Sequence, residues 1–305
     1  MWFKNLRIYS LIQKIEYNPN ELNSALSKFE FQPCGNLDPV KYGWVSPLGV
    51  DGSEFVHAAN GYMMVCAKRQ EKVLPTSIVK ETLETKIAAI SSEEARFVGR
   101  AEKQNLKEEI IFSLLPKAFA KSSYDFAYID TKKQLIFINT SSANRAEELI
   151  SALREAIGSL KVIPLRPNDS PKDVLTNWLT KQDVPDDIEV GEECELSSVE
   201  DGRSIKFKHQ NLSIDEIGQH INSGLQVAKL AISWKDSIEC VIDDQFCFKR
   251  IKYTNEIMEK ADNNNSDNAA DQFDIDFSIM ALELSEFIDT VSRAFGGINV
   301  KPSAL

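Results

Sequence analysis

The stretch FVHAANGYMMVCAKR, residues 55–69, predicts a β-hairpin. Apolar residues lie on both sides of Asn60-Gly61, a dipeptide that readily adopts the positive φ angles of a tight hairpin turn. Before it, residues 1–13 alternate between apolar and polar side chains as a first strand would, and residues 19–29 have helical spacing. The order strand, helix, strand, strand predicts an α+β unit.

The pattern changes to helix after Pro75. No proline occurs from Ser77 to Leu115, and the apolar residues there follow helical spacing in two pieces. Ser91 and Glu94 are spaced as in a capping box, which predicts a helix start between the two pieces. This segment is therefore expected to be a helical hairpin or small bundle inserted between β-rich parts.

The rest of the chain returns to mixed α and β patterns. Residues 124–165 predict two strands around a Lys132-Lys133 turn, a helix and a further strand, and residues 166–173 resemble a connector. Beyond it we expect a helix, an acidic loop, several strands, a polar loop at 261–271 and a last helix. The predicted fold is α+β, with an antiparallel-sheet centre (1–75 and 120–166), a helical tip insertion (76–119) and a C-terminal acidic α+β base (167–305).

Composition and charge narrow the class of protein. The chain has 305 residues and a net charge of −11, but residues 1–133 carry +2 and residues 134–305 carry −13. This asymmetry is compatible with a basic working surface backed by an acidic exterior. No apolar run approaches the roughly 20 residues needed to span a bilayer, and no secretory signal is apparent. The five scattered cysteines without a CxxC pair favour free thiols, so we expect a cytoplasmic protein.

Motifs for enzymatic chemistry are mostly absent. There is no phosphate-binding glycine loop, and the three histidines lie far apart, so we expect no cofactor, no metal and no catalytic residue. Two acidic pairs, Asp243-Asp244 and Asp274 with Asp276, could hold Mg²⁺ in a nuclease. A turn for the first pair and a helix N-terminus for Asp274 explain them more simply.

Clusters of basic residues suggest contact with phosphate. They lie at the end of one strand, in the helical insert and on two later strands: Lys68, Arg69 and Lys72; Arg96, Arg100, Lys103 and Lys107; Lys206 and Lys208; and Lys249. The second group would share one helical face if the helix were continuous through Gly99. A solvated helix face explains that group equally well, because glutamates are interspersed. No base-reading helix is evident, so any nucleic-acid binding should be independent of sequence.

Several runs together resemble the bacterial recombination-associated RdgC family. They extend through nearly the whole chain at matching order and spacing: MWFKNLRIYSL, FQPCG, GWVSPLG, ANGYMMVCAKRQEKVLP, LLPKAFAKSS, IGSLKVIPL and LAISW. Tyr62 and the Asn-rich segment 261–271 depart from the family pattern, but neither touches a residue on which function would turn.

The resemblance implies a nucleoid-associated, non-enzymatic protein that binds duplex DNA without strong sequence preference. Family members form a ring-shaped homodimer whose hole admits DNA, and they limit access of RecA. Helical tips make one of the two dimer contacts, so Phe119 would be the aromatic at that contact, with Lys117 and Lys121 flanking it. The alternative is that Phe119 packs under its own helix end.

The residues expected to bind DNA are the basic residues named above except Lys107, together with Lys117, Lys121 and Lys229. Two other functions stay open on the sequence alone. One is a metal-dependent nuclease that uses the acidic pairs. The other is a scaffold that binds proteins through the acidic C-terminal half.

Overall fold

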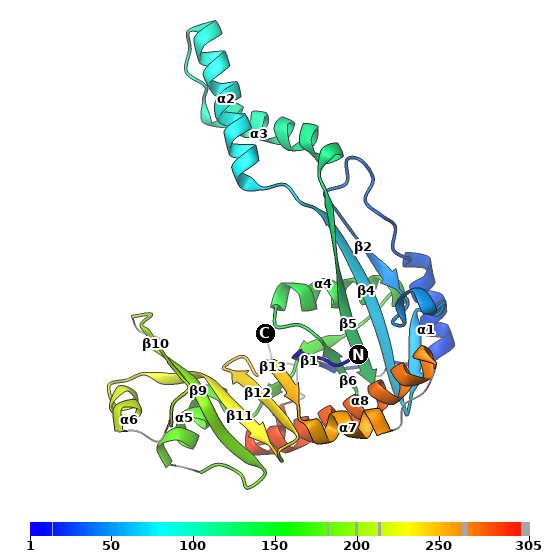
Figure 1. The fold of residues 1–305 in the computed structure, drawn as a ribbon, viewed down its shortest axis with the longest axis vertical. Helices are drawn as coiled ribbons and strands as arrows, with labels where there is room; N and C mark the ends of the chain where they lie inside the picture. Colours follow the sequence, from blue (N-terminus) through cyan, green and yellow to red (C-terminus); the bar gives the residue numbers. More distant parts are fainter. Residues whose placement is uncertain (14, 182, 199–200, 213–214, 264–267, 300–305) are drawn as a thin grey trace.

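The computed structural model describes residues 1–305 except 14, 182, 199–200, 213–214, 264–267 and 300–305. The chain forms an arc (Figure 1). Helices α2 (Thr76–Glu94) and α3 (Arg100–Leu114) lie at one end of it. Strand β10 (Ser204–Lys208) and helix α6 (Asp215–Asn222) lie at the other.

One antiparallel sheet of 12 strands runs through the described residues, in the order β10-β9-β11-β12-β13-β1-β6-β5-β4-β2, with β3 and β7 paired beside it. Strand β1 (Asn5–Leu11) joins its two halves, because it pairs with β13 (Phe248–Tyr253) on one side and β6 (Leu135–Ile138) on the other. The other strands are β2 (Val40–Val45), β3 (Val56–Ala59), β4 (Tyr62–Lys72), β5 (Ala120–Asp130), β7 (Val162–Pro164), β9 (Ile188–Ser197), β11 (Gln226–Trp234) and β12 (Ile238–Asp243). The predicted α+β class with an antiparallel sheet is confirmed.

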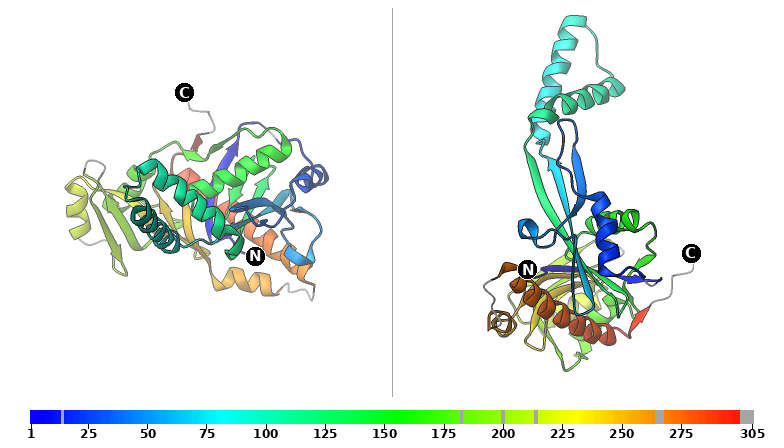
Figure 2. Two further views of the ribbon diagram at one scale, coloured as in Figure 1. Left: turned by 90° about the horizontal axis from the view of Figure 1, so that it is seen from above. Right: turned by 90° about the vertical axis from the view of Figure 1, so that its right-hand side faces the viewer.

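The expected hairpin forms at Asn60-Gly61, where both residues have positive φ angles, 53° and 88°. Strand β4 then pairs with β5 over all 11 of its residues, from Tyr62 opposite Asp130 to Lys72 opposite Ala120. This ladder, about 36 Å long at about 3.3 Å per residue, carries α2 and α3 away from the rest of the molecule (Figure 2, right).

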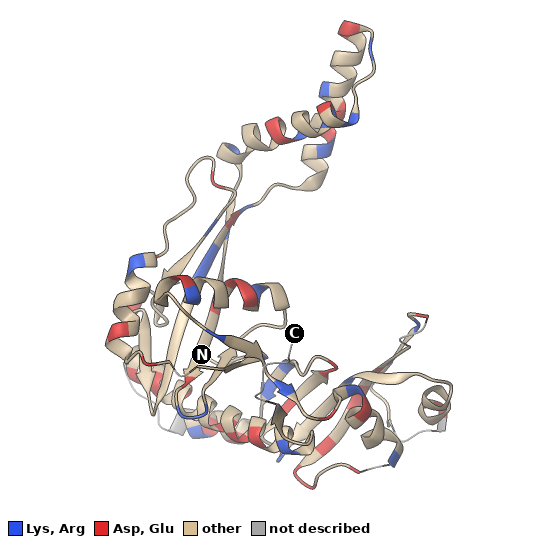
Figure 3. Cartoon of the chain, turned by 180° about the vertical axis from the view of Figure 1, so that it is seen from behind, with Lys and Arg blue, Asp and Glu red and all other residues tan. Residues whose placement is uncertain are grey.

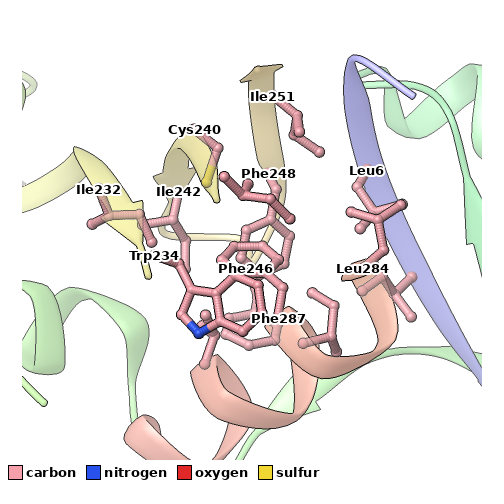
Figure 4. Packing of buried hydrophobic residues seen from close by; sticks show 14 of the residues in the cluster. Leu6, Ile232, Trp234, Cys240, Ile242, Phe246, Phe248, Ile251, Leu284 and Phe287 are labelled. Atoms are coloured by element: carbon pink, nitrogen blue, oxygen red, sulfur yellow. The ribbon is translucent and has the colours of Figure 1, made fainter. Parts of the chain in front are cut away.

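Helices pack on both faces of the sheet in the N-terminal half of the chain. Helices α1 (Pro19–Leu26) and α4 (Ala143–Ile157) bury Leu22, Leu26 and Leu149 against one face. On the other face, α8 (Ala269–Ala294) contacts strands from both halves of the chain. Its Phe277 lies 5.7 Å from the Tyr128 ring, and its Phe287 packs beneath the strands of the C-terminal half (Figure 4). The last helix therefore fixes the two halves of the arc to each other.

The remaining helices are α5 (Pro171–Lys181) and α7 (Asn255–Asn263), with short 3₁₀ turns at Ser27–Phe29, Gly49–Asp51 and Leu115–Lys117. Strand β8 (Arg166–Pro167) pairs with β14 (Ile298–Asn299), so residues 166–173 are more than a connector. The acidic segment forms β9 instead of a loop. Helices α6 and α7 were not expected, and residues 264–267 of the predicted polar loop lie outside the described residues.

The predicted helix start at Ser91 is wrong. Helix α2 continues through Glu94, and the chain then reverses at Ala95, whose φ is 48°. Helix α3 begins only at Arg100, after Gly99 in extended conformation. The fully buried Val98 anchors this turn between the two helices. A helix continuous through Gly99 is therefore excluded.

Candidate nucleic-acid interface

The C-terminal strands turn one face toward the interior of the arc. On β11, Ile232 and Trp234 point toward α8, which lies beneath the sheet on the outer side of the arc (Figures 1 and 4). Because successive side chains of a strand point to opposite faces, Lys229 lies on the other face. That open face, formed by β9 to β13, is called the base floor below.

Most of the expected lysines of the base floor have acidic partners. Lys229 Nζ lies 2.7 Å from Glu195 Oε2, and Lys206 Nζ lies 3.6 Å from the same oxygen. Lys249 Nζ lies 2.6 Å from an oxygen of Asp243. Positive and negative segments accordingly lie beside one another on these strands (Figure 3). Among the described residues, Lys208 is exposed and has no acidic partner within ion-pair distance.

The basic residues of the β4–β5 ladder lie on opposite faces. The register places Lys68 opposite Tyr124, and its ammonium lies 4.6 Å from the centre of the Phe31 ring. Arg69 and Lys121 lie on the other face, where α4 closes a cleft of about 560 Å³. The strand end thus presents two smaller groups instead of one basic cluster.

The cleft beside α4 carries mixed charge. Arg69 is paired with Glu71 and Glu148, and Arg145 lies 2.6 Å from the buried Asp125. Burial, followed by the charge of Asp125, raises the pKa of the Tyr42 hydroxyl that lies next to this pair. Lys121 is the exposed cation here, and Lys72 Nζ, on the other face, contacts the carbonyl oxygen of Ala118 at 3.5 Å.

The tip cations do not form one helical face. Arg96 lies in the turn between the helices, and its guanidinium is held by Glu94 at 2.5 Å and Glu102 at 2.6 Å. The hydrogen bonds that Arg96 donates to these carboxylates, Glu102 first, raise its pKa. Arg100 is exposed on α3, and Lys103 lies over the Phe97 ring at 5.0 Å. The condition for a four-cation face, a helix continuous through Gly99, is therefore not met.

Phe119 does not pack under its own helix end, because 87% of the residue is exposed. Its carbonyl oxygen accepts a hydrogen bond from Val73 N at 2.7 Å, which closes the neck of the helical projection. Lys117 beside it is also exposed. Two further exposed aromatics, Phe97 and Phe112, were not predicted, because neither belongs to the apolar stripes that marked the helices.

The acidic pairs have structural roles. Asp243 is buried and accepts hydrogen bonds from the backbone amides of Gln245 and Cys247. Asp244 forms an ion pair with Lys172 at 3.2 Å. Asp274, in the first part of α8, lies 2.9 Å from a ring nitrogen of His57. Within the described part of the chain, no group of three His, Cys, Asp or Glu side chains could hold a metal ion.

The cysteine thiols are a further class of reactive group in the chain. Burial raises the pKa of the Cys194 thiol to about 12 and that of Cys247 to about 11, so neither resembles an activated nucleophile. A search of the described helices finds none with the length and apolarity to cross a bilayer.

The structure thus defines an arc-shaped α+β protein built on one long antiparallel sheet, with a helical projection at one end and a charged inner floor. A family model described as "Putative exonuclease, RdgC" matches residues 1–298, and the chain belongs to the RdgC family. The resemblance noted in the sequence is confirmed.

Individual relatives match over almost their whole length. The "Recombination-associated protein RdgC" of Psychromonas ingrahamii is 39% identical over 298 residues, which cover 97% of this chain and 99% of the relative. The proteins of that name from Serratia proteamaculans and Aeromonas hydrophila are 39% and 38% identical over the same length, covering 97% of this chain and 98% of each relative. These names refer to recombination, whereas the family description refers to an exonuclease.

Proposed function

We propose that this protein binds double-stranded DNA without strong sequence preference, as a homodimeric ring that encircles the duplex and limits access of RecA during recombination and replication. The observation that carries the proposal is the direction of the base floor. By strand alternation its lysines lie on the face opposite the core residues Ile232 and Trp234, although the chain as a whole carries −11. The protein would be nucleoid-associated in the cytoplasm.

The two ends of the arc suit closure by a second copy. An arc with a projection at each end becomes a ring when a two-fold axis places like ends together. The exposed Phe119 supports a contact near the helical end. The division into centre, tip and base, with the bounds given above, is part of the same proposal.

The test is binding to labelled duplexes of unrelated random sequence across a salt series, followed by fluorescence anisotropy without Mg²⁺. Four full phosphate contacts by the base-floor lysines of one protomer would give a slope of at most about −3.6 in log K against log salt, or about 150-fold between about 50 and 200 mM. Equal affinity for unrelated sequences with a steep salt dependence supports the proposal. Absence of binding at low salt refutes it and favours the scaffold function.

The competing nuclease function is favoured by the description of the family model. It predicts Mg²⁺-dependent shortening of an end-labelled duplex. We expect the duplex to stay intact, and a RecA filament assay on the same DNA to show slower filament growth when the protein is bound first. Progressive shortening that EDTA abolishes would contradict the proposal.

A further inference from the structure

One carboxylate of the base floor bridges two of the lysines proposed to contact DNA. Glu195 lies on β9, directly opposite Lys206 of β10 and Lys229 of β11. A single oxygen, Oε2, lies 2.7 Å from Lys229 Nζ and 3.6 Å from Lys206 Nζ. Both ammonium groups are therefore drawn to the same point between the strands.

The environment of the Glu195 carboxylate favours its charged form. Burial alone would raise the pKa of Glu195, but the hydrogen bonds and charges of Lys229 and Lys206 outweigh it and lower that pKa. The Glu195 side chain is 20% exposed, whereas Lys229 and Lys206 are 37% and 60% exposed. The carboxylate thus sits below the lysines, and a phosphate from the interior of the arc would meet the lysines first.

The alternation of charge continues along the sheet. Asp243 lies opposite Lys229 on β12, and Lys249 of β13 is paired with Asp243. Facing residues on neighbouring strands are about 5 Å apart, so the row lysine, glutamate, lysine, aspartate, lysine crosses five strands. Ion pairs join Lys206 and Lys229 to Glu195, and Lys249 to Asp243. The row of three lysines and two carboxylates therefore has a net charge of only +1.

We propose that Glu195 is a counter-charge that limits the affinity of the base floor for DNA, because it competes with phosphate for Lys206 and Lys229. The proposal rests on the DNA-binding function proposed above and names the residue that tunes it. Each of these lysines must exchange its carboxylate for a phosphate, so its phosphate contact releases less free energy than that of a free lysine.

The chain contains a matched comparison on a single strand. Lys206 and Lys208 lie two residues apart on the same face of β10 and are both exposed. Lys206 shares Glu195, whereas the residue opposite Lys208, Glu193, is paired with Arg250 at 2.8 Å. If the counter-charge matters, the two lysines should differ in their effect on DNA binding although their positions are nearly equivalent.

The first experiment compares the salt dependence of duplex binding by wild type and Glu195→Gln. Glutamine keeps the size of the side chain and releases both lysines. We expect the slope of log K against log salt to steepen by about 1 to 2, and binding at about 50 mM salt to tighten about tenfold. The control is Glu286→Gln on α8, which removes the same charge from the ion pair with Lys235. It should change the dissociation constant less than about twofold.

The second experiment compares Lys206→Met with Lys208→Met, and does not depend on the Glu195 variant folding. Lys208→Met should reduce the magnitude of the salt slope by about 0.9, and Lys206→Met by less than about half of that. In a Lys206→Met/Lys229→Met background, Glu195→Gln should no longer tighten binding.

The possible failures are distinguishable. If wild type does not bind duplex at low salt, the proposed function is refuted. If wild type binds and folded Glu195→Gln has the same slope, the counter-charge proposal alone is refuted. Weaker binding by Glu195→Gln would also overturn it, because Glu195 would then hold the two lysines in the geometry that binds phosphate.

Discussion

The substitution Phe119→Ser tests the proposed contact at the helical end of the arc. In the single chain the side chain makes little contact, since 87% of the residue is exposed. The hydrogen bond from Val73 to this residue uses only the backbone, so serine can retain it. The substitution should therefore leave the folding of one chain almost unchanged and act only where two chains meet.

The expected magnitude follows from the exposed area. An aromatic side chain offers roughly 200 Å², of which about 170 Å² is accessible here. If the partner covers half of this area, each ring contributes about 2 kcal/mol at about 25 cal/mol per Å². A two-fold axis doubles the effect to about 4 kcal/mol, which corresponds to about a 1000-fold weaker dimer.

The assay is sedimentation equilibrium over a concentration series, with thermal unfolding as the check on folding. The matched control is Leu282→Ser on α8, which also removes an exposed apolar side chain but lies far from the helical end. Phe119→Ser should weaken the dimer while the control does not. A dimer dissociation constant equal to that of wild type would refute the contact at Phe119.

Three further predictions concern stability. Asp125→Asn leaves Arg145, which is about one third exposed, beside a buried neutral partner 2.6 Å away, and should lower the free energy of unfolding in urea by about 1–3 kcal/mol; an unchanged midpoint would contradict it. Phe287→Ala opens a cavity beside Trp234 and should cost about 3–5 kcal/mol in the same assay, and a loss under about 1 kcal/mol would refute this packing. Burial raises the pKa of Glu283, so the ionised side chain opposes folding above that pKa. Glu283→Gln should therefore raise Tm at pH 8 but not below about pH 4, where the glutamate is protonated in both states. A lower Tm at pH 8 would contradict this prediction.

Elements with short-range signals could be predicted from the sequence. The Asn60-Gly61 turn, the change to helix after Pro75 and the helix α4 all depend on residues close together in the chain. Strand β5 shows the limit of such signals. Its first residues, AKSSY, have no apolar alternation, and they become a strand because β4 offers them a full-length pairing partner.

The charge pairs of the base floor lay beyond sequence reasoning for the same physical reason. Lys206 and Lys229 could be identified as basic residues on strands, but their neutralisation by Glu195 depends on which strand lies between them. Strand order is set by contacts distant in sequence, including α8 beneath the sheet. The strand order β10-β9-β11 places Glu195 of β9 between Lys206 of β10 and Lys229 of β11. No local sequence pattern reveals this order.

Closure and charge are separable properties of the proposed ring, and DNA topology distinguishes them. From a linear duplex a ring can leave by sliding off an end, so its residence time depends on the contacts of the base floor. From a closed circle it can leave only by opening, so its residence time depends on the contact at Phe119. Phe119→Ser should therefore reduce the ratio of residence times on circular and linear DNA toward 1. Glu195→Gln should lengthen residence on linear DNA with the dimer contact intact. If Phe119→Ser left that ratio unchanged, retention would not depend on closure of a ring at this residue.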